Sequence, residues 1–235
     1  MGSTWGNALK ISIFGESHGA GIGVVLDGFP SGIDYDEAFV LREMERRAPG
    51  RNKQSTARKE ADLPQILSGI YNGKTTGTPI CAVIGNTNTR SQDYQALLAQ
   101  PRPGHADYTG SVRFHGFNDP RGGGHFSGRL TAPLVFAGAL CKLYLKQKGI
   151  TVGAHIQSIA QIQDTAFDDV AVSAEELDAL RMQEYPVINP RALTAMLAAI
   201  EDARNDCDSV GGVIECAAVG LPAGLGSPMM DTVES

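Results

Sequence analysis

The chain has 235 residues, 42% of them hydrophobic and 20% charged, and its formal net charge is −6. This length and apolar content suffice for a folded core, and the acidic balance argues against a dedicated nucleic-acid binder, because phosphate backbones select basic surfaces. The N-terminus has no basic segment before an apolar one and the longest apolar run contains Pro133, so we expect a cytoplasmic protein without membrane insertion.

The N-terminal part of the chain combines strand-like runs with glycine-rich loops. Alternating apolar residues predict a strand over residues 9–14, which leads into the loop "FGESHGAG", and a second strand over 22–26. Apolar residues at helical spacing predict a helix over residues 34–47, with Asp34 as its N-cap and arginines in its last turn. Residues 48–62 are polar, basic and without periodicity, so we expect a mobile loop there.

Further along the chain, the patterns predict two strands and three helices. A β-branched, apolar run predicts a strand over residues 79–85, and a similar run predicts one over 213–219. Helices are expected over residues 131–148, 173–182 and 190–205, where proline is confined to first turns and Gly149 follows the first helix.

A cluster of basic residues covers the end of the first predicted helix and the loop after it. Seven cations lie within eighteen positions: Arg42, Arg46, Arg47, Arg51, Lys53, Arg58 and Lys59. Such a run is usually a solvated helix face. Few acidic residues stand nearby to pair it, only Glu43, Glu45 and Glu60, and this favours a small polyanionic ligand, because guanidinium groups match carboxylate and phosphate oxygens.

A second group of motifs consists of "RPGHADY" at residues 102–108 and "DPRGGGHFSGR" at residues 119–129. Three consecutive glycines can turn their N–H groups toward an anion, and Ser127 adds a hydroxyl between Arg121 and Arg129. A flexible surface loop is the alternative, since glycine-rich loops alone are weak indicators of a ligand.

Two histidines, His18 and His105, stand next to glycine in loops that follow strand-like sequence. Both are candidate acids near neutral pH, although a single histidine is more often a surface or hydrogen-bonded residue. A metal site is not expected, because His115 and His125 lack helical ligand spacing and no cysteine cluster joins them. Four scattered cysteines predict buried, reduced thiols: Cys81, Cys141, Cys207 and Cys216.

Seven segments of the chain resemble the chorismate synthase family in their order and spacing. They are "FGESHG", "RRAPG", "TARKEAD", "LSGIYNGKTTGTPI", "RPGHADYTG", "RGGGHFSGRLTA" and "DSVGGVIECAAVGLPAGLGSP". The resemblance implies an α+β fold in which helices are packed between two antiparallel sheets. It also implies one domain over residues 1–235 that lacks the family's C-terminal part, because family chains continue beyond "AGLGSPMMDTVES".

The same resemblance implies a carbon–oxygen lyase of the shikimate pathway, which serves aromatic amino-acid biosynthesis. The expected reaction is the anti-1,4-elimination of phosphate from 5-enolpyruvylshikimate 3-phosphate to give chorismate, with reduced FMN as cofactor and NADPH needed only indirectly, for flavin reduction. A homotetramer is implied for the full-length form, and the flavin is expected to be reduced either by a separate flavin reductase or by an activity within the same polypeptide. Neither nucleic acid nor membrane is expected as a partner. The alternative is an inactive fragment that retains only flavin or anion binding.

By resemblance, His18 matches the histidine that protonates the reduced flavin, and His105 matches the one that assists phosphate departure. Three basic residues match substrate-binding positions of the family: Arg47, Lys53 and Arg129. Three residues occupy the family's common "RSS" triplet at the flavin: His125, Phe126 and Ser127. Two of these three depart from the triplet, so we expect the loop backbone and the serine hydroxyl to carry the flavin contact.

Overall fold

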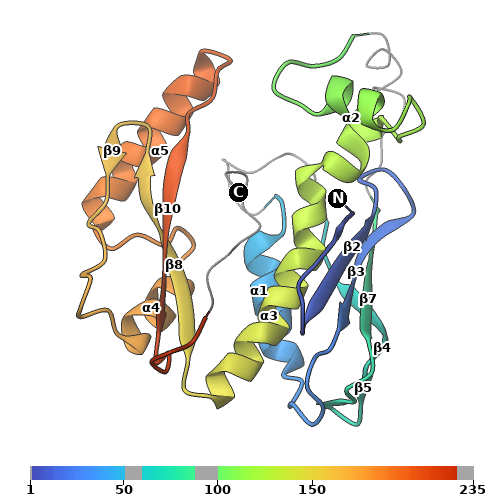
Figure 1. The fold of residues 1–235 in the computed structure, drawn as a ribbon. Helices are drawn as coiled ribbons and strands as arrows, with labels where there is room; N and C mark the ends of the chain where they lie inside the picture. Colours follow the sequence, from blue (N-terminus) through green and yellow to red (C-terminus); the bar gives the residue numbers. More distant parts are fainter. Residues whose placement is uncertain (1, 51–59, 88–99, 227–235) are drawn as a thin grey trace. The chain divides into compact units, whose positions relative to one another are not determined.

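The computed structural model describes residues 2–50, 60–87 and 100–226 (Figure 1). The chain divides into two compact units, Met1–Tyr144 and Leu145–Ser235. Every strand pairing among the described residues is antiparallel, and each unit has its own sheet. The α+β class is therefore confirmed, whereas one domain over residues 1–235 stays a prediction.

The first unit contains a five-stranded sheet in the order β1-β2-β3-β7-β4. Its strands are Thr4–Trp5 (β1), Lys10–Gly15 (β2), Gly21–Asp27 (β3), Pro64–Ser68 (β4) and Ile80–Gly85 (β7). A small hairpin is formed by Ile70–Tyr71 (β5) and Lys74–Thr75 (β6). The helices and turns are Glu37–Arg47 (α1), Asp107–Arg113 (α2), Arg121–Phe126 (η2), Gly128–Leu130 (η3) and Thr131–Gln147 (α3).

Helices α1 and α3 cover one face of this sheet (Figure 1). Alternate residues of the two central strands, such as Ile22 in β3 and Ile80 in β7, are fully buried on that face, where Val40 of α1 and Phe136 of α3 meet them. Apolar side chains recur at every second position of the strands and at about every fourth position of the helices, so they meet in a single apolar layer. Burial of each large apolar side chain in this layer stabilises the fold by about 1.5–3 kcal/mol.

The start of α1 differs from the sequence-based expectation. Asp36, not Asp34, is the N-cap, and its Oδ1 accepts a 2.9 Å hydrogen bond from the N–H of Phe39. Asp34 instead pairs with Lys74 of the β5-β6 hairpin, both through a backbone bridge and through an ion pair. This long-range pairing holds Asp34 in extended backbone, so the helix begins three residues later.

The second unit contains a three-stranded sheet in the order β10-β8-β9. Its elements are Thr151–Ile159 (β8), Ile162–Gln163 (β9), Ala174–Arg181 (α4), Pro190–Asn205 (α5) and Gly212–Val219 (β10). Leu177 of α4 and Met196 of α5 are buried beneath the sheet. Ser173 and Asn189 cap the two helices by accepting backbone hydrogen bonds, which explains where each begins.

The predicted helices and strands are all present, with ends that agree to within three residues, whereas the long strand β8 was not predicted. All four cysteines are free, as expected. Their predicted burial is wrong, because Cys207 follows the end of α5 and Cys216 lies on edge strand β10, where both are exposed. No helix among the described residues has the length and hydropathy to span a membrane.

Candidate functional site

The loop "FGESHG" forms a tight turn where β2 ends. The N–H of Gly19 donates to the carbonyl of Glu16 at 3.1 Å, and the N–H of Ser17 donates to the carbonyl of Gly124 at 3.1 Å. Ser17 is buried and His18 is partly buried. The first motif is therefore joined to the glycine-rich motif more than a hundred residues later.

Three consecutive glycines make this approach possible. Gly122, Gly123 and Gly124 have φ of 60°, 83° and 53°, a left-handed run that other residues rarely adopt. A Cβ on Gly122 would lie 2.3 Å from both Cε1 and Nδ1 of His18, and a Cβ on Gly124 would lie 2.1 Å from the carbonyl of Asp119. The glycines thus allow the backbone to pack directly against the His18 ring.

An aspartate and an arginine close the start of the glycine turn. Asp119 accepts from the backbone N–H of Arg121 at 3.0 Å and from its guanidinium at 2.6–3.2 Å. These hydrogen bonds hold the pKa of Asp119 below its usual value, and the charge of nearby His18 contributes to a smaller extent. Arg121, expected at the edge of an anion loop, is therefore paired within the protein.

The second histidine lies in a similarly closed turn. His105 is exposed, and its Nδ1 lies 3.3 Å from the carbonyl of Pro103. Asp107 accepts three hydrogen bonds from Arg102, one from its backbone and two from its guanidinium. A Cβ on Gly123 would lie 4.0 Å from Nη2 of Arg102, so this turn adjoins the glycine turn.

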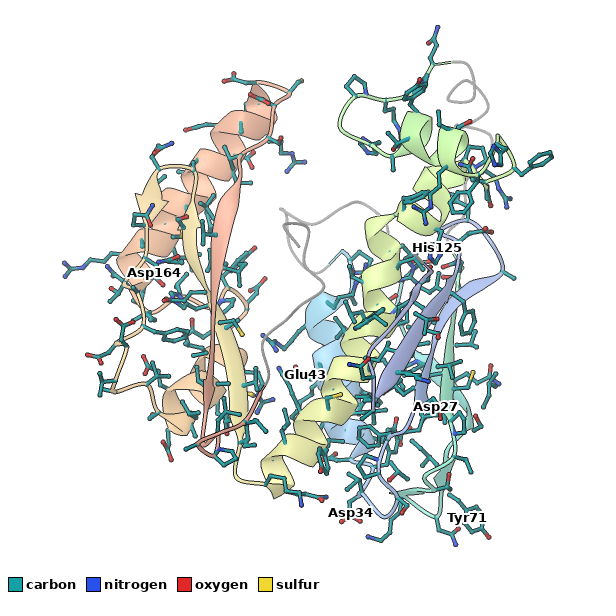
Figure 2. All side chains as sticks on the ribbon, viewed as in Figure 1. Asp27, Asp34, Glu43, Tyr71, His125 and Asp164 are labelled. Carbon is teal, nitrogen blue, oxygen red and sulfur yellow. The ribbon has the colours of Figure 1, made fainter. Side chains whose placement is uncertain are left out.

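His125 connects the glycine turn to the N-terminal strands (Figure 2). Its Nδ1 lies 2.9 Å from the carbonyl of Gly15, which makes Nδ1 the protonated nitrogen, and its Nε2 lies 2.6 Å from the hydroxyl of Ser3. Both ring nitrogens are therefore used within the chain. The predicted flavin contact of His125 could therefore be made only by the face of its ring or by its backbone.

Phe126 lies beside a cavity of about 480 Å³. Its ring centroid is 6.0 Å from that of Phe114, and Gly110 of α2 leaves room for the same ring. The cavity is lined mainly by aromatic side chains and the end of β2: Ser3, Ile13, Phe14, Gly15, Glu16, Phe114, Phe117, Asn118, Asp119, His125 and Phe126. An apolar, aromatic-walled cavity thus adjoins the His18 turn.

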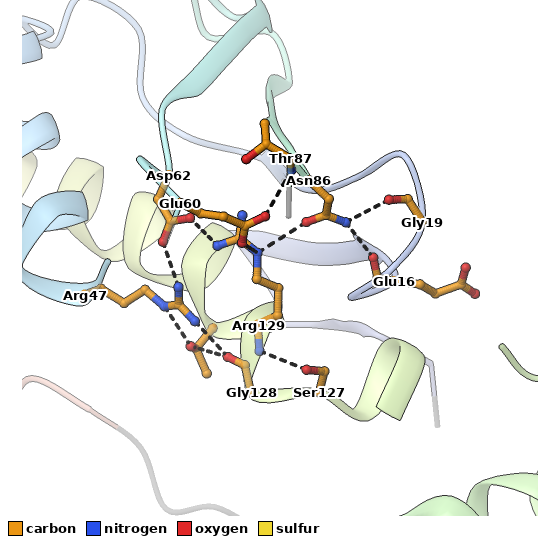
Figure 3. Close-up of polar contacts among 11 residues, drawn as sticks. Glu16, Gly19, Arg47, Glu60, Asp62, Asn86, Thr87, Ser127, Gly128 and Arg129 are labelled. Carbon is orange, nitrogen blue, oxygen red and sulfur yellow. Dashed lines mark hydrogen bonds and ion pairs between the residues drawn. The ribbon is translucent and has the colours of Figure 1, made fainter. Parts of the chain in front are cut away.

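Two of the predicted substrate-binding arginines share one buried carboxylate (Figure 3). Asp62 pairs with Nη1 of Arg47 at 2.7 Å and, through its other oxygen, with Arg129. Arg129 also pairs with Glu60, and the side chains of Glu60, Asp62 and Arg129 are at most 3% exposed. Arg47 reaches Gly128 and Thr131 as well, while its side chain stays 19% exposed.

Asn86, directly after β7, links this ion-pair network to the His18 turn (Figure 3). Its Nδ2 donates to the carbonyls of Glu16 and Gly19, each at 2.9 Å, and its Oδ1 accepts from Nε of Arg129 at 3.2 Å. The hydroxyl of Ser127 accepts a 3.3 Å hydrogen bond from the backbone N–H of Arg129, the second residue of turn η3. The serine therefore caps a helical turn in this structure.

The structure brings together the loops of His18, His105 and the three glycines, and the roles of these residues stay predictions. The expectation that the basic cluster has little acid to pair it is wrong for Arg46 and Arg47, which pair with Glu43 and Asp62. Part of the predicted mobile loop, residues 51–59 with Lys53, lies outside the described residues, whereas Glu60 and Asp62 are buried. Sequence reasoning missed the roles of four further residues: Asp62, Asn86, Asp107 and Asp119.

A family model described as chorismate synthase matches residues 9–235 of the chain. The chain belongs to the chorismate synthase family. It is 44% identical to the chorismate synthase of Parabacteroides distasonis over 97% of this chain and 62% of that protein, and 42% identical to that of Thermococcus kodakarensis over 98% and 62%. A crystal structure of chorismate synthase matches with a TM-score of 0.70 and 28% identity, over 94% of this chain and 60% of the other.

The chain thus spans about 62% of the length of these chorismate synthases. The family likeness covers both compact units, because the matched residues extend from residue 9, just before β2, to residue 235. The resemblance seen in the motifs therefore extends over nearly the whole chain.

Proposed function

We propose that this chain carries the His18 and His105 part of a chorismate synthase site. The reaction is the elimination of phosphate from 5-enolpyruvylshikimate 3-phosphate to give chorismate, with reduced FMN as cofactor and NADPH needed only to reduce it. The observation that supports this most is the packing of the His18 turn, the glycine turn and the turn of residues 102–107 against one another.

The residues beside the His18 turn fit the ring part of a flavin. The cavity of about 480 Å³ falls in the range of small-molecule pockets, and Phe14, Phe114 and Phe126 offer apolar walls for a planar ring. Glu16 and Asp119 line the same cavity and would repel a phosphate, so we propose that only the ring lies there. When bound, the reduced flavin supplies a transient electron that eases phosphate departure and is then recovered.

In this proposal the two histidines hold and move protons. His18, packed against Gly122 beside the cavity, donates a proton to the flavin ring. His105 hydrogen-bonds the carbonyl of Pro103 through Nδ1, so the doubly protonated ring gives its Nε2 proton to the departing phosphate and is left neutral with the remaining proton on Nδ1. Both roles need neutral-pH acids, for which imidazole is suited.

The substrate carries two carboxylates and a phosphate, and we propose that Arg47, Lys53 and Arg129 serve these groups, with direct contact made by Arg47 and Lys53. Arg47 is the best supported of the three, because its guanidinium is partly exposed while Asp62 and the carbonyl of Gly128 fix its orientation. The buried Arg129 acts from behind through the same aspartate. For the flavin we propose the backbone of His125, the ring of Phe126 and the hydroxyl of Ser127.

The first experiment is FMN binding by the 235-residue chain, followed by flavin fluorescence with and without the enolpyruvyl substrate and by chorismate formation under reducing conditions. Binding that tightens with substrate, together with turnover, supports the lyase. Binding without turnover favours the alternative, a chain that only binds flavin or anions. Absence of FMN binding by folded protein overturns the proposed site.

We further propose that the full-length form is a homotetramer in the cytoplasm, with a separate flavin reductase as partner. Analytical ultracentrifugation of the full-length form tests the first point. Reduction of added FMN by the chain itself with NADPH would contradict the need for a separate reductase.

A further inference from the structure

The turn of residues 102–107 is closed by its first and last residues. The backbone N–H of Arg102 donates to Oδ2 of Asp107 at 3.0 Å, its Nε donates to the same oxygen at 2.9 Å, and its Nη2 donates to Oδ1 at 3.0 Å. The Asp107 side chain is 7% exposed. A bidentate, charge-assisted pair of this kind fixes geometry more firmly than a single contact.

The pair stays charged over the whole physiological range. The hydrogen bonds that Arg102 donates to Asp107 lower the pKa of this aspartate to about 2. Gly104 inside the turn has φ of 73°, and the N–H of His105 lies 3.4 Å from the carbonyl of Arg102. The backbone on both sides of His105 is therefore held by contacts made within six residues.

A contact within this closed turn favours one tautomer of His105. The carbonyl of Pro103 can only accept a hydrogen bond, so its contact with Nδ1 requires an N–H there. In the neutral ring Nε2 then keeps its lone pair, and among the described residues Nε2 has no hydrogen-bond partner. An exposed imidazole without such a carbonyl has no equivalent reason to prefer Nδ1–H.

We propose that Asp107 is a positioning residue, which through its ion pair with Arg102 holds the turn so that His105 keeps its proton on Nδ1, and Nε2 is the nitrogen that takes up a second proton and in that form faces an anionic ligand. The part that concerns the ligand rests on the proposed function; the choice of tautomer does not. Asp107 also begins helix α2, so a purely structural role would affect the helix and leave the tautomer unchanged.

The test is a long-range ¹H–¹⁵N spectrum of the histidine-labelled 235-residue chain, recorded well above the ordinary histidine pKa of about 6.5 so that the rings are neutral. Loss of one signal in His105→Gln assigns His105. In Asp107→Asn the fraction of His105 rings with the proton on Nδ1 should fall by about a factor of two or more. The reason is that only the hydrogen bond from Nδ1 to the carbonyl of Pro103 favours that tautomer, and the loosened turn no longer holds this bond. Asp178→Asn is the matched control, since it breaks an exposed Asp178–Arg181 pair in the second unit.

Arg102→Gln breaks the same ion pair from outside α2, and should give the same shift even if Asp107→Asn melts that helix. An unchanged Nδ1–H fraction in Arg102→Gln overturns the proposal. Because the spectrum needs neither flavin nor substrate, a wild-type chain that fails to form chorismate refutes the proposed function without affecting this result.

Discussion

The ring of His18 lies against the backbone of Gly122 so closely that no side chain fits between them. A methyl group on Gly122 would be 2.3 Å from the imidazole, and φ at this position is +60°. We predict that Gly122→Ala displaces His18 and destabilises the chain by about 1–3 kcal/mol, the range for forced strain. Histidine NMR signals and chemical denaturation measure the two effects.

Gly138→Ala is the control for this substitution. Gly138 is exposed in α3, and a Cβ there meets nothing within 4 Å, so the change should raise the free energy of unfolding by up to about 1 kcal/mol. An unaltered His18 signal in Gly122→Ala would contradict the packing described here.

Asp62 pairs with the buried Arg129 and with the partly exposed Arg47, so its loss should destabilise the fold. We predict that Asp62→Asn lowers the free energy of unfolding by about 3–5 kcal/mol, because it leaves the buried charge of Arg129 short of one partner. Asp34→Asn makes the same chemical change at the exposed Asp34–Lys74 pair, where the expected loss is within about 1 kcal/mol. Equal losses in the two variants would refute a special role for Asp62.

His155, in the second unit, is fully buried between two carboxylates. Its Nδ1 lies 3.1 Å from Asp164 and its Nε2 lies 2.8 Å from Glu215, so each nitrogen faces an acceptor. We predict that His155→Gln costs about 3–5 kcal/mol, as for a broken buried pair. In a Glu215→Gln background the same substitution should cost less, and a double-mutant cycle by denaturation measures the difference.

Acid should remove the contribution of Asp107 in a defined pH window. Hydrogen bonds from Arg102 lower its pKa from 3.8 to about 2 in the folded chain. A carboxylate with a depressed pKa stabilises the fold above its unfolded pKa, and this contribution disappears as the pH falls through the folded value. The stability difference between wild type and Asp107→Asn should therefore be constant above pH of about 5 and shrink toward pH 2.

Thermal unfolding at a series of pH values measures this difference. A gap between the two proteins that stays constant down to the lowest pH would show that the carboxylate is not preferentially ionised in the folded state.

Local patterns predicted the elements whose partners are close in the chain, such as α5 with its cap Asn189 and first-turn proline. Strand β8 escaped prediction because its inward positions include Gly153 and His155, which break the apolar alternation expected of a buried face. His155 is acceptable there only because Glu215 and Asp164 satisfy it, and no local pattern reveals that.

The candidate site was predicted only in part, because local patterns reveal contiguous motifs and not partners that are distant in the chain. Its motifs are contiguous, so His18, His105 and the three glycines stood out in the sequence. The ion pairs are not contiguous: Asp62 is 67 positions from Arg129 in the chain, and Asp34 joins Lys74 instead of capping a helix. Such pairings depend on the sheet that brings their segments together.

The single amide of Asn86 has a thermodynamic consequence. It holds two carbonyls of the His18 turn with its nitrogen and Arg129 with its oxygen. An anion that draws Arg129 away from Asn86 therefore loosens the turn that orients His18, whereas a ligand that immobilises His18 keeps Arg129 in place. By reciprocity of linked equilibria, each ligand then alters the affinity for the other by the same factor, so binding of an anion at Arg129 and of a ligand at His18 would be coupled through this one side chain.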